Sequence, residues 1–221
     1  MKLSILIPSL PIRVGNFLAR IVEELNRQID ELKRDDIELL VYIDNKKRTL
    51  GNKRNTLIEL STGDFIVFVD DDDRVSKDYV ATIIKTIDEN PDADCIVYDV
   101  FCTVSNSLDT NVEPYSFICK YGIEFEYVGH TETTPWYGKP AQIMTWNREI
   151  LERCNFPDIT LGSDYPWVKI AWVSIKKQVR IDKILYYYDS DAATSQALDY
   201  KYVKKYRRYM TGEERKECGI K

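Results

Sequence analysis

The chain has 221 residues, of which 44% are hydrophobic and 30% are charged, as in an ordinary globular domain. No run approaches 18 consecutive apolar residues, and the first residues lack a signal peptide's apolar segment and cleavage site. Five cysteines without CxxC spacing indicate neither a zinc site nor a disulfide framework. The sequence therefore predicts a soluble, cytoplasmic protein in a reducing compartment.

The formal net charge of -5 is unevenly distributed along the chain. Residues 201–221 contain eight Lys or Arg against three Glu, which gives +5 and leaves -10 on the remainder. We therefore expect one domain over residues 1–200, followed by a basic helical tail at 201–221. The Lys, Arg and Tyr residues of this tail would also suit a nucleic-acid backbone.

The first 60 residues alternate apolar strands with helices. Residues 3–8 predict a buried strand, and apolar residues at helical spacing across 17–32 predict a helix. Residues 37–44 predict a second strand. A polar loop over residues 45–55 is then expected to lead into a short helix around 57–60.

The same alternation continues to residue 101. Residues 65–69 (FIVFV) predict a third strand, Ser76 is the predicted N-cap of a helix that stops at Asn90-Pro91, and residues 95–101 predict a fourth strand. Strands that are apolar throughout and alternate with amphipathic helices indicate a parallel sheet covered on both faces. The predicted fold class is α/β, with a Rossmann-like, mostly parallel sheet flanked by helices.

The pattern weakens after residue 103. Residues 103–116 predict a turn-rich excursion, and helical character returns around 147–153 and 165–176. Residues from Val179 onward predict a strand that runs into a loop. Neither an internal repeat nor a low-complexity segment is present.

Polar side chains follow three of the predicted strands where each strand ends. They are Ser9, Asp44 and the run Asp70–Asp73. Because ligands bind beyond the carboxyl ends of parallel strands, these groups are expected to meet at one edge of the sheet. Four adjacent carboxylates repel one another, so the run faces either open water or a cation. The Asp-x-Asp spacing, which occurs twice in the run, suits Mg²⁺ or Mn²⁺.

Residues 49–80 (TLGNKRNTLIELSTGDFIVFVDDDDRVSKDYV) resemble the nucleotide-sugar-binding half of a family-2 glycosyltransferase with the GT-A fold. The matching motif residues are Gly51, Arg54-Asn55, Gly63-Asp64 and Asp70–Asp73. The resemblance extends over residues 3–90. It implies a nucleotide-sugar-binding half at 1–102 and an acceptor-binding half at 103–200.

The resemblance also implies the residues of a donor site for a nucleotide-diphosphate sugar, most commonly a UDP-sugar. The implied donor-binding residues are Pro8, Ser9, Asp44, Arg54, Asp70 and Asp71. The implied ligands of a bound Mn²⁺ or Mg²⁺ are Asp72, Asp70 and Asp191. The family often supplies a His ligand after an aromatic-rich strand. The similar stretch here, LYYYDSDAATS, has no His, so Asp189 or Asp191 is expected to replace it.

The stretch LGSDYPW is similar to the acidic pair that carries the family's catalytic base. Ser163 stands where the family usually has Glu, and Asp164 is the implied base. A base that deprotonates an acceptor hydroxyl during one direct displacement gives inversion at the anomeric carbon. The resemblance therefore implies an inverting, metal-dependent glycosyltransferase.

Alternatives remain open from the sequence alone. The acceptor is expected to be a glycan, or a hydroxylated base in DNA if the basic tail binds nucleic acid. The form Asp-x-Asp-x-Val also occurs in haloacid-dehalogenase-type phosphatases, although there the nucleophile follows the first strand. A nucleotide-sugar-binding protein without catalytic activity is a third hypothesis, because the expected Glu and His are missing.

Overall fold

The structure is a computed structural model that describes residues 1–106, 113–160 and 162–191. The chain divides into two compact units. The first unit comprises Met1–Cys102 and Ser116–Asp189, and the second comprises Thr103–Tyr115 and Ser190–Lys221. The predicted basic tail lies outside the described residues, and the predicted division into halves stays a prediction. The fold and the site described below belong to the first unit.

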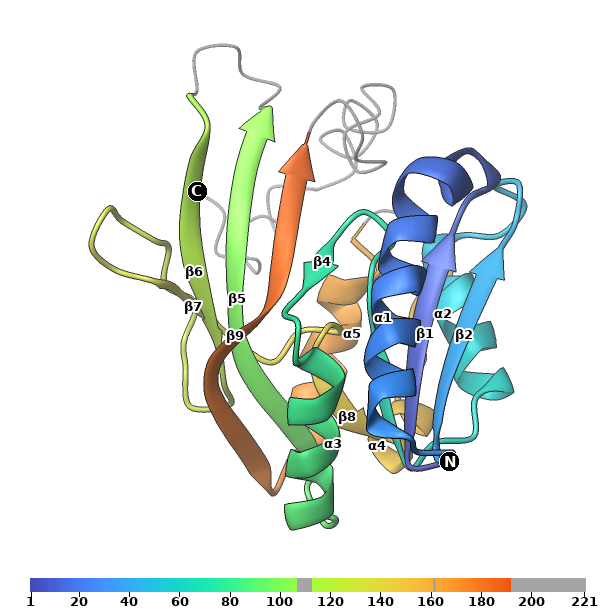
Figure 1. Ribbon diagram of the computed structural model, residues 1–221. Coiled ribbons are helices and arrows are strands. Elements are labelled where there is room, and N and C mark those ends of the chain that lie inside the picture. Colours follow the sequence, from blue (N-terminus) through green and yellow to red (C-terminus); the bar gives the residue numbers. More distant parts are fainter. Residues whose placement is uncertain (107–112, 161, 192–221) are drawn as a thin grey trace. The chain divides into compact units, whose positions relative to one another are not determined.

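Three parallel strands form the N-terminal half of the sheet. β1 (Leu3–Ser9) lies between β2 (Ile37–Ile43) and β3 (Phe65–Phe68) and runs parallel to both. Figure 1 shows β1 beside β2. β1 and β3 are buried along their whole length, whereas β2 at the edge is partly exposed. This arrangement confirms the prediction from the apolar runs, because strands covered on both faces need apolar residues at every position.

Beyond β3 the sheet also contains antiparallel pairs. β8 (Thr145–Asn147) lies between β3 and β5 (Cys95–Asn106) and is antiparallel to both. The other strands are β4 (Arg74–Val75), β6 (Tyr115–Tyr121), β7 (Trp136–Gly138) and β9 (Gln178–Asp191). The predicted turn-rich segment at 103–116 is wrong at its start and its end, since β5 continues to Asn106 and β6 begins at Tyr115.

Helices cover the sheet as the alternation predicts. They are α1 (Ala19–Leu32), α2 (Leu50–Leu60), α3 (Tyr79–Glu89), α4 (Arg148–Glu152) and α5 (Asp164–Ala171), with short helical turns η1 (Pro11–Arg13), η2 (Val14–Leu18) and η3 (Trp172–Ser174). α1 and α2 lie on opposite faces of β1 and β2 (Figure 1). None of the helices in the described ranges is long and apolar enough to cross a membrane.

Two predicted helix starts are wrong. α2 begins at Leu50, inside the predicted polar loop, because the Thr49 side chain accepts a hydrogen bond from the Asn52 N–H and caps the helix. α3 is preceded by Asp78 instead of Ser76. Ser76 forms a turn of its own, in which its carbonyl accepts from Tyr79 N–H and its hydroxyl donates to Asp78.

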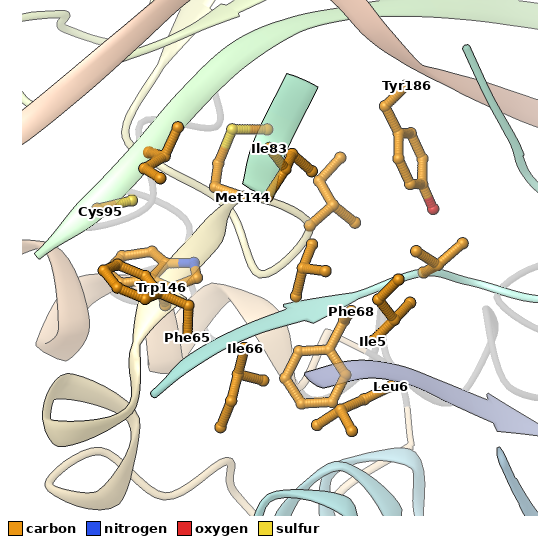
Figure 2. Close-up of a cluster of buried hydrophobic side chains, with 14 of the residues drawn as sticks. Ile5, Leu6, Phe65, Ile66, Phe68, Ile83, Cys95, Met144, Trp146 and Tyr186 are labelled. Atoms are coloured by element: carbon orange, nitrogen blue, oxygen red, sulfur yellow. The ribbon is translucent and has the colours of Figure 1, made fainter. Parts of the chain in front are cut away.

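The core explains why β8 lies between β3 and β5. Trp146 of β8 is fully buried, and it stands in register with Ile66 of β3 and Cys95 of β5. Figure 2 shows Trp146 among the buried side chains of these strands, together with Phe65 and Met144. Burying a large aromatic ring stabilises the fold by about 2 kcal/mol or more, so the three-residue strand is held by its side chain as well as by its backbone.

Gly51, one of the motif glycines, is required by close packing. A Cβ atom at this position would lie 1.9 Å from the carbonyl oxygen of Pro157, a backbone atom. We expect Gly51→Ala to lower the free energy of unfolding by about 2 kcal/mol or more, because the backbone must move to relieve the overlap. Urea denaturation measures this change. Gly129→Ala is the matched control, since a Cβ there meets no atom within 4 Å. Equal stability of the two variants would contradict the prediction.

Candidate active site

The aspartate run after β3 alternates between buried and partly exposed side chains. Asp71 and Asp73 are 2% and 0% exposed, whereas the side chains of Asp70 and Asp72 are 23% and 20% exposed. The run forms a turn in which the Asp73 N–H donates to the Asp70 carbonyl at 3.2 Å. Of the two Asp-x-Asp pairs in the sequence, the accessible one is Asp70 and Asp72. We call these two residues the outer pair, and Asp71 and Asp73 the inner pair.

The inner pair anchors the turn to the sheet. Asp71 accepts from the Ser9 hydroxyl and from Arg13 Nη1, both at 2.5 Å. Asp73 accepts from the Tyr186 hydroxyl at 2.6 Å and from the Asp189 N–H at 3.0 Å. Figure 2 shows the buried side chain of Tyr186. Both carboxylates therefore already have protein donors. The assignment of Asp71 to the donor site stays a prediction.

The outer pair concentrates negative charge. Burial raises the pKa of Asp72 to about 6, with the charges of Asp70 and Asp71 adding to the rise and that of Arg13 opposing it. Burial also raises the pKa of Asp70. The charge of Arg54 opposes this rise, and the charges of Asp71 and Asp164 add to it. Since the charge of Asp164 acts on Asp70, the predicted base lies within electrostatic reach of the outer pair.

Two buried cations beside the carboxylates were not predicted from the sequence. Arg13 of η1 lies between the inner and outer pairs, with Nη1 at 2.5 Å from Asp71 and 3.0 Å from Asp72. Lys53 of α2 is 4% exposed, and its Nζ lies 2.9 Å from the Ser9 carbonyl and 2.5 Å from Asp44 Oδ1. They offset part of the negative charge at the carboxyl ends of the strands.

Asp44 and Ser9 meet through Lys53, as the strand ends predicted. Burial acts to raise the pKa of Asp44, but the Lys53 ammonium and the Arg48 N–H outweigh it and lower this pKa. Lys53 lies four residues before Leu57, which is also buried, so both belong to the inner face of α2. Extending the predicted helix back to Leu50 would have revealed this position of Lys53.

Arg54 connects the end of β3 with the start of α5. Its guanidinium lies over the rings of Phe68 and Phe156, 5.9 and 5.4 Å from their centres. Nη2 lies 3.4 Å from Asp70 Oδ1, and Nη1 donates to Ser163 Oγ at 3.1 Å. Ser163 directly precedes Asp164, the first residue of α5. Arg54, a predicted donor-site residue, therefore contacts the residue that directly precedes the predicted base.

The remaining predicted site residues differ in their surroundings. Pro8 is buried within β1. Asp189 binds Arg74 through two hydrogen bonds of 2.6 and 2.8 Å, so its carboxylate already has a cationic partner. Asp191 ends β9, and its side chain lies outside the described part of the chain. The ring of His130 stacks on Phe117.

No group of three or more His, Cys, Asp or Glu side chains is placed to hold a metal ion in the described ranges. The outer pair nevertheless fits a hard divalent cation in its donor atoms, since Mg²⁺ and Mn²⁺ take carboxylate oxygens and complete their coordination with water and substrate phosphates. Burial is the main cause of the raised pKa of Asp72, and the charges of Asp70 and Asp71 add to the rise. The residues present therefore fit such an ion as a partial site.

The mixed α/β sheet flanked by helices is the fold of the GT-A class of glycosyltransferases. The chain belongs to glycosyl transferase family 2, whose sequence model matches residues 22–152, more than half of the chain. This confirms the resemblance noted in the sequence and favours it over the phosphatase hypothesis.

Similar proteins of known structure share this fold. The crystal structure of S. aureus TarS 1-349 has a TM-score of 0.53 and 17% sequence identity, with 86% of this chain and 60% of that chain covered. The same fragment in complex with UDP-GlcNAc also has a TM-score of 0.53 and 17% identity, with 86% and 59% covered.

A curated protein gives a shorter match. A glucosyl-dolichyl phosphate glucuronosyltransferase from Haloferax volcanii is 31% identical over 71 residues, which are 32% of this chain and 22% of that protein. The chain thus spans less than two thirds of each of these proteins.

Proposed function

We propose that this chain transfers a sugar from a nucleotide-diphosphate sugar, with UDP as the nucleotide, to a hydroxyl group of a glycan acceptor, with inversion at the anomeric carbon. The observation that carries the proposal is the outer pair Asp70 and Asp72, which stands accessible at the strand ends within electrostatic reach of Asp164. Family membership supports it, as do the complexes of TarS with UDP-GlcNAc and UDP.

The donor would bind along the carboxyl ends of β1, β2 and β3. Pro8, Ser9 and Asp44 provide the wall for the nucleoside, and Lys53 holds Ser9 and Asp44 in place through its two contacts. Arg13 would keep the turn of aspartates in position through Asp71 and Asp72, while Asp70 and Asp72 stay partly exposed. This placement follows the general rule for ligands of α/β sheets.

The donor atoms of the outer pair suit a divalent cation, Mn²⁺ or Mg²⁺. Asp72 and Asp70 would hold it, and Asp191 is the further ligand that the family resemblance suggests. When bound, such an ion offsets the charge that develops on the leaving diphosphate. Asp72 is also paired with Arg13, whose Nη1 lies 3.0 Å from the carboxylate.

Asp164 is the proposed general base. It would accept the proton of the acceptor hydroxyl while the hydroxyl oxygen attacks the anomeric carbon from the side opposite the diphosphate. One displacement of this kind inverts the configuration. The acceptor half proposed for residues 103–200 supplies α5, on which Asp164 lies.

A glycan is the acceptor class that we propose. The names of two similar proteins concern sugar donors and a glycosylated lipid phosphate. The DNA-acceptor hypothesis depended on the basic residues 201–221, which lie outside the described ranges, and it is not proposed.

Calorimetric titration of UDP, GDP, CDP and dTDP, with and without Mn²⁺, tests the donor site. We expect UDP to bind in the presence of Mn²⁺, and Asp72→Asn to weaken this binding at least about tenfold because a carboxylate ligand is lost. Asp35→Asn, at an exposed aspartate before β2, is the control and is expected to bind UDP like the wild type.

Two results would contradict the proposal. Failure of all four nucleotides to bind, with and without Mn²⁺, would exclude the donor site. Tight UDP binding without release of UDP from any UDP-sugar, across a broad panel of acceptors, would favour the hypothesis of a binding protein without catalytic activity.

A further inference from the structure

Ser163 stands at the start of α5, where a serine hydroxyl commonly caps a helix. Here the hydroxyl makes no capping hydrogen bond to the helix. It is fully buried and instead accepts from Arg54 Nη1 at 3.1 Å. The preceding residue, Gly162, has a φ of +66°, so the chain enters α5 through a left-handed turn. The Ser163 side chain therefore attaches the start of α5 to Arg54 of α2 and does not cap the helix.

The body of α5 is held by aromatic packing. Trp167 is fully buried, its ring stacks on Phe156 at 4.6 Å, and its indole N–H donates to the Cys154 carbonyl at 2.7 Å. Phe156 in turn contacts Phe68 of β3 edge to face, with ring centres 5.6 Å apart. These contacts fix the helix three residues beyond Asp164. These contacts are made by Trp167, so the position of Asp164 at the start of the helix depends on a different interaction.

Arg54 supplies that interaction from a rigid position. Its side chain is almost fully buried, with the guanidinium over both Phe68 and Phe156. From there it reaches Asp70 of the outer pair and Ser163 of α5 with separate nitrogen atoms. Its Nε atom is buried and lacks a hydrogen-bond partner among the described residues, so the contacts made by the two terminal nitrogens determine how the guanidinium is oriented.

We propose that Arg54 and Ser163 form a positioning pair that sets the distance between Asp164 and the outer aspartates. Arg54 is then a positioning residue that acts through Ser163. This inference rests on the proposed glycosyltransferase function, in which Asp164 must reach the acceptor hydroxyl while Asp70 faces the donor. A misplacement of about 1 Å in such an arrangement costs about 10²-fold in rate. Lys is no substitute for Arg here, because it lacks the planar fork that reaches two acceptors.

Release of UDP from a panel of UDP-sugars that includes UDP-GlcNAc, with Mn²⁺ and a mixed oligosaccharide acceptor, tests the pair. We expect Ser163→Ala to lower kcat about 10- to 100-fold, while KM for the UDP-sugar and Kd for UDP stay within about twofold. Ser163→Thr, which keeps the hydroxyl, is expected to restore most of kcat. Arg54→Lys should lower kcat as Ser163→Ala does, and adding Ser163→Ala to it should change kcat by no more than about twofold.

Ser4→Ala is the matched control, because Ser4 is also fully buried and its hydroxyl also hydrogen-bonds, to Glu38 and to the Gly63 N–H near the start of β1. It is expected to lower the melting temperature without changing kcat. Thermal unfolding of every variant identifies losses of activity caused by unfolding.

The proposal is overturned if Ser163→Ala keeps wild-type kcat, if folded Ser163→Thr is as slow as Ser163→Ala, or if the effects of substitutions at Arg54 and Ser163 on kcat multiply. Absence of UDP release by the wild type would instead overturn the proposed function, and this inference with it.

Discussion

Asp164→Asn is expected to lower kcat for sugar transfer by about 10² to 10⁴-fold, the usual contribution of a general base. The amide has nearly the same shape as the carboxylate but does not accept the proton of the acceptor hydroxyl. Binding of UDP with Mn²⁺ should be unchanged, because Asp164 lies on α5 and the proposed donor contacts come from the strand ends. Steady-state assays of UDP release, paired with calorimetry, measure both quantities.

Asp35→Asn is the control for the same charge change on the exposed surface before β2, and we expect it to keep wild-type kcat. An Asp164→Asn variant that retains wild-type kcat would exclude Asp164 as the base and direct attention to the outer pair.

Arg13→Met is expected to lower the free energy of unfolding by about 3 kcal/mol at neutral pH, since removing one member of a buried ion pair leaves an uncompensated charge. Arg13 contacts both Asp71 and Asp72, and Asp71 is almost fully buried. Methionine has a similar length and keeps the packing of the aliphatic part of the side chain. Urea denaturation without divalent cations measures the change.

Arg27→Met provides the comparison, because Arg27 forms ion pairs with Glu24 and Glu31 on the exposed surface of α1. Water and salt screen such exposed pairs, so this variant should remain close to the wild type. Mn²⁺ with UDP should restore part of the stability lost in Arg13→Met, since ligands that bind only the folded state stabilise it. Equal losses in the two variants would mean that Arg13 does not stabilise the aspartate turn.

Local sequence patterns were sufficient to predict the strand ends and which polar residues gather there. The parallel order of β1, β2 and β3 follows from apolar runs separated by helices, and it brings Ser9, Asp44 and the aspartate run to one edge. The motif residues Arg54 and Asp70 do lie together, as expected from the resemblance. These features depend on the periodicity of the chain and on the geometry that all parallel sheets share.

The contacts that were missed connect residues far apart in the sequence. Arg54 and Ser163 are separated by 109 positions, and Arg13 and Asp71 by 58. No period or spacing relates such residues, because their meeting depends on how whole helices pack. β8 was missed for a related reason. Three residues are too short for a strand pattern, and the position of Trp146 is decided by the core that it fills.

The alternation of buried and exposed side chains along residues 70–73 has a consequence for how this protein tolerates genetic change. Four identical residues in a row suggest redundancy, so that any one could take the place of its neighbour. In the folded chain, however, each aspartate occupies a different environment, and shifting the run by one position would exchange the inward side chains with the outward ones. A codon inserted or deleted within this run would keep an acidic stretch in the sequence while moving the outer carboxylates out of place. Length variants at this turn should therefore be rarer among functional relatives than substitutions at any single one of the four positions.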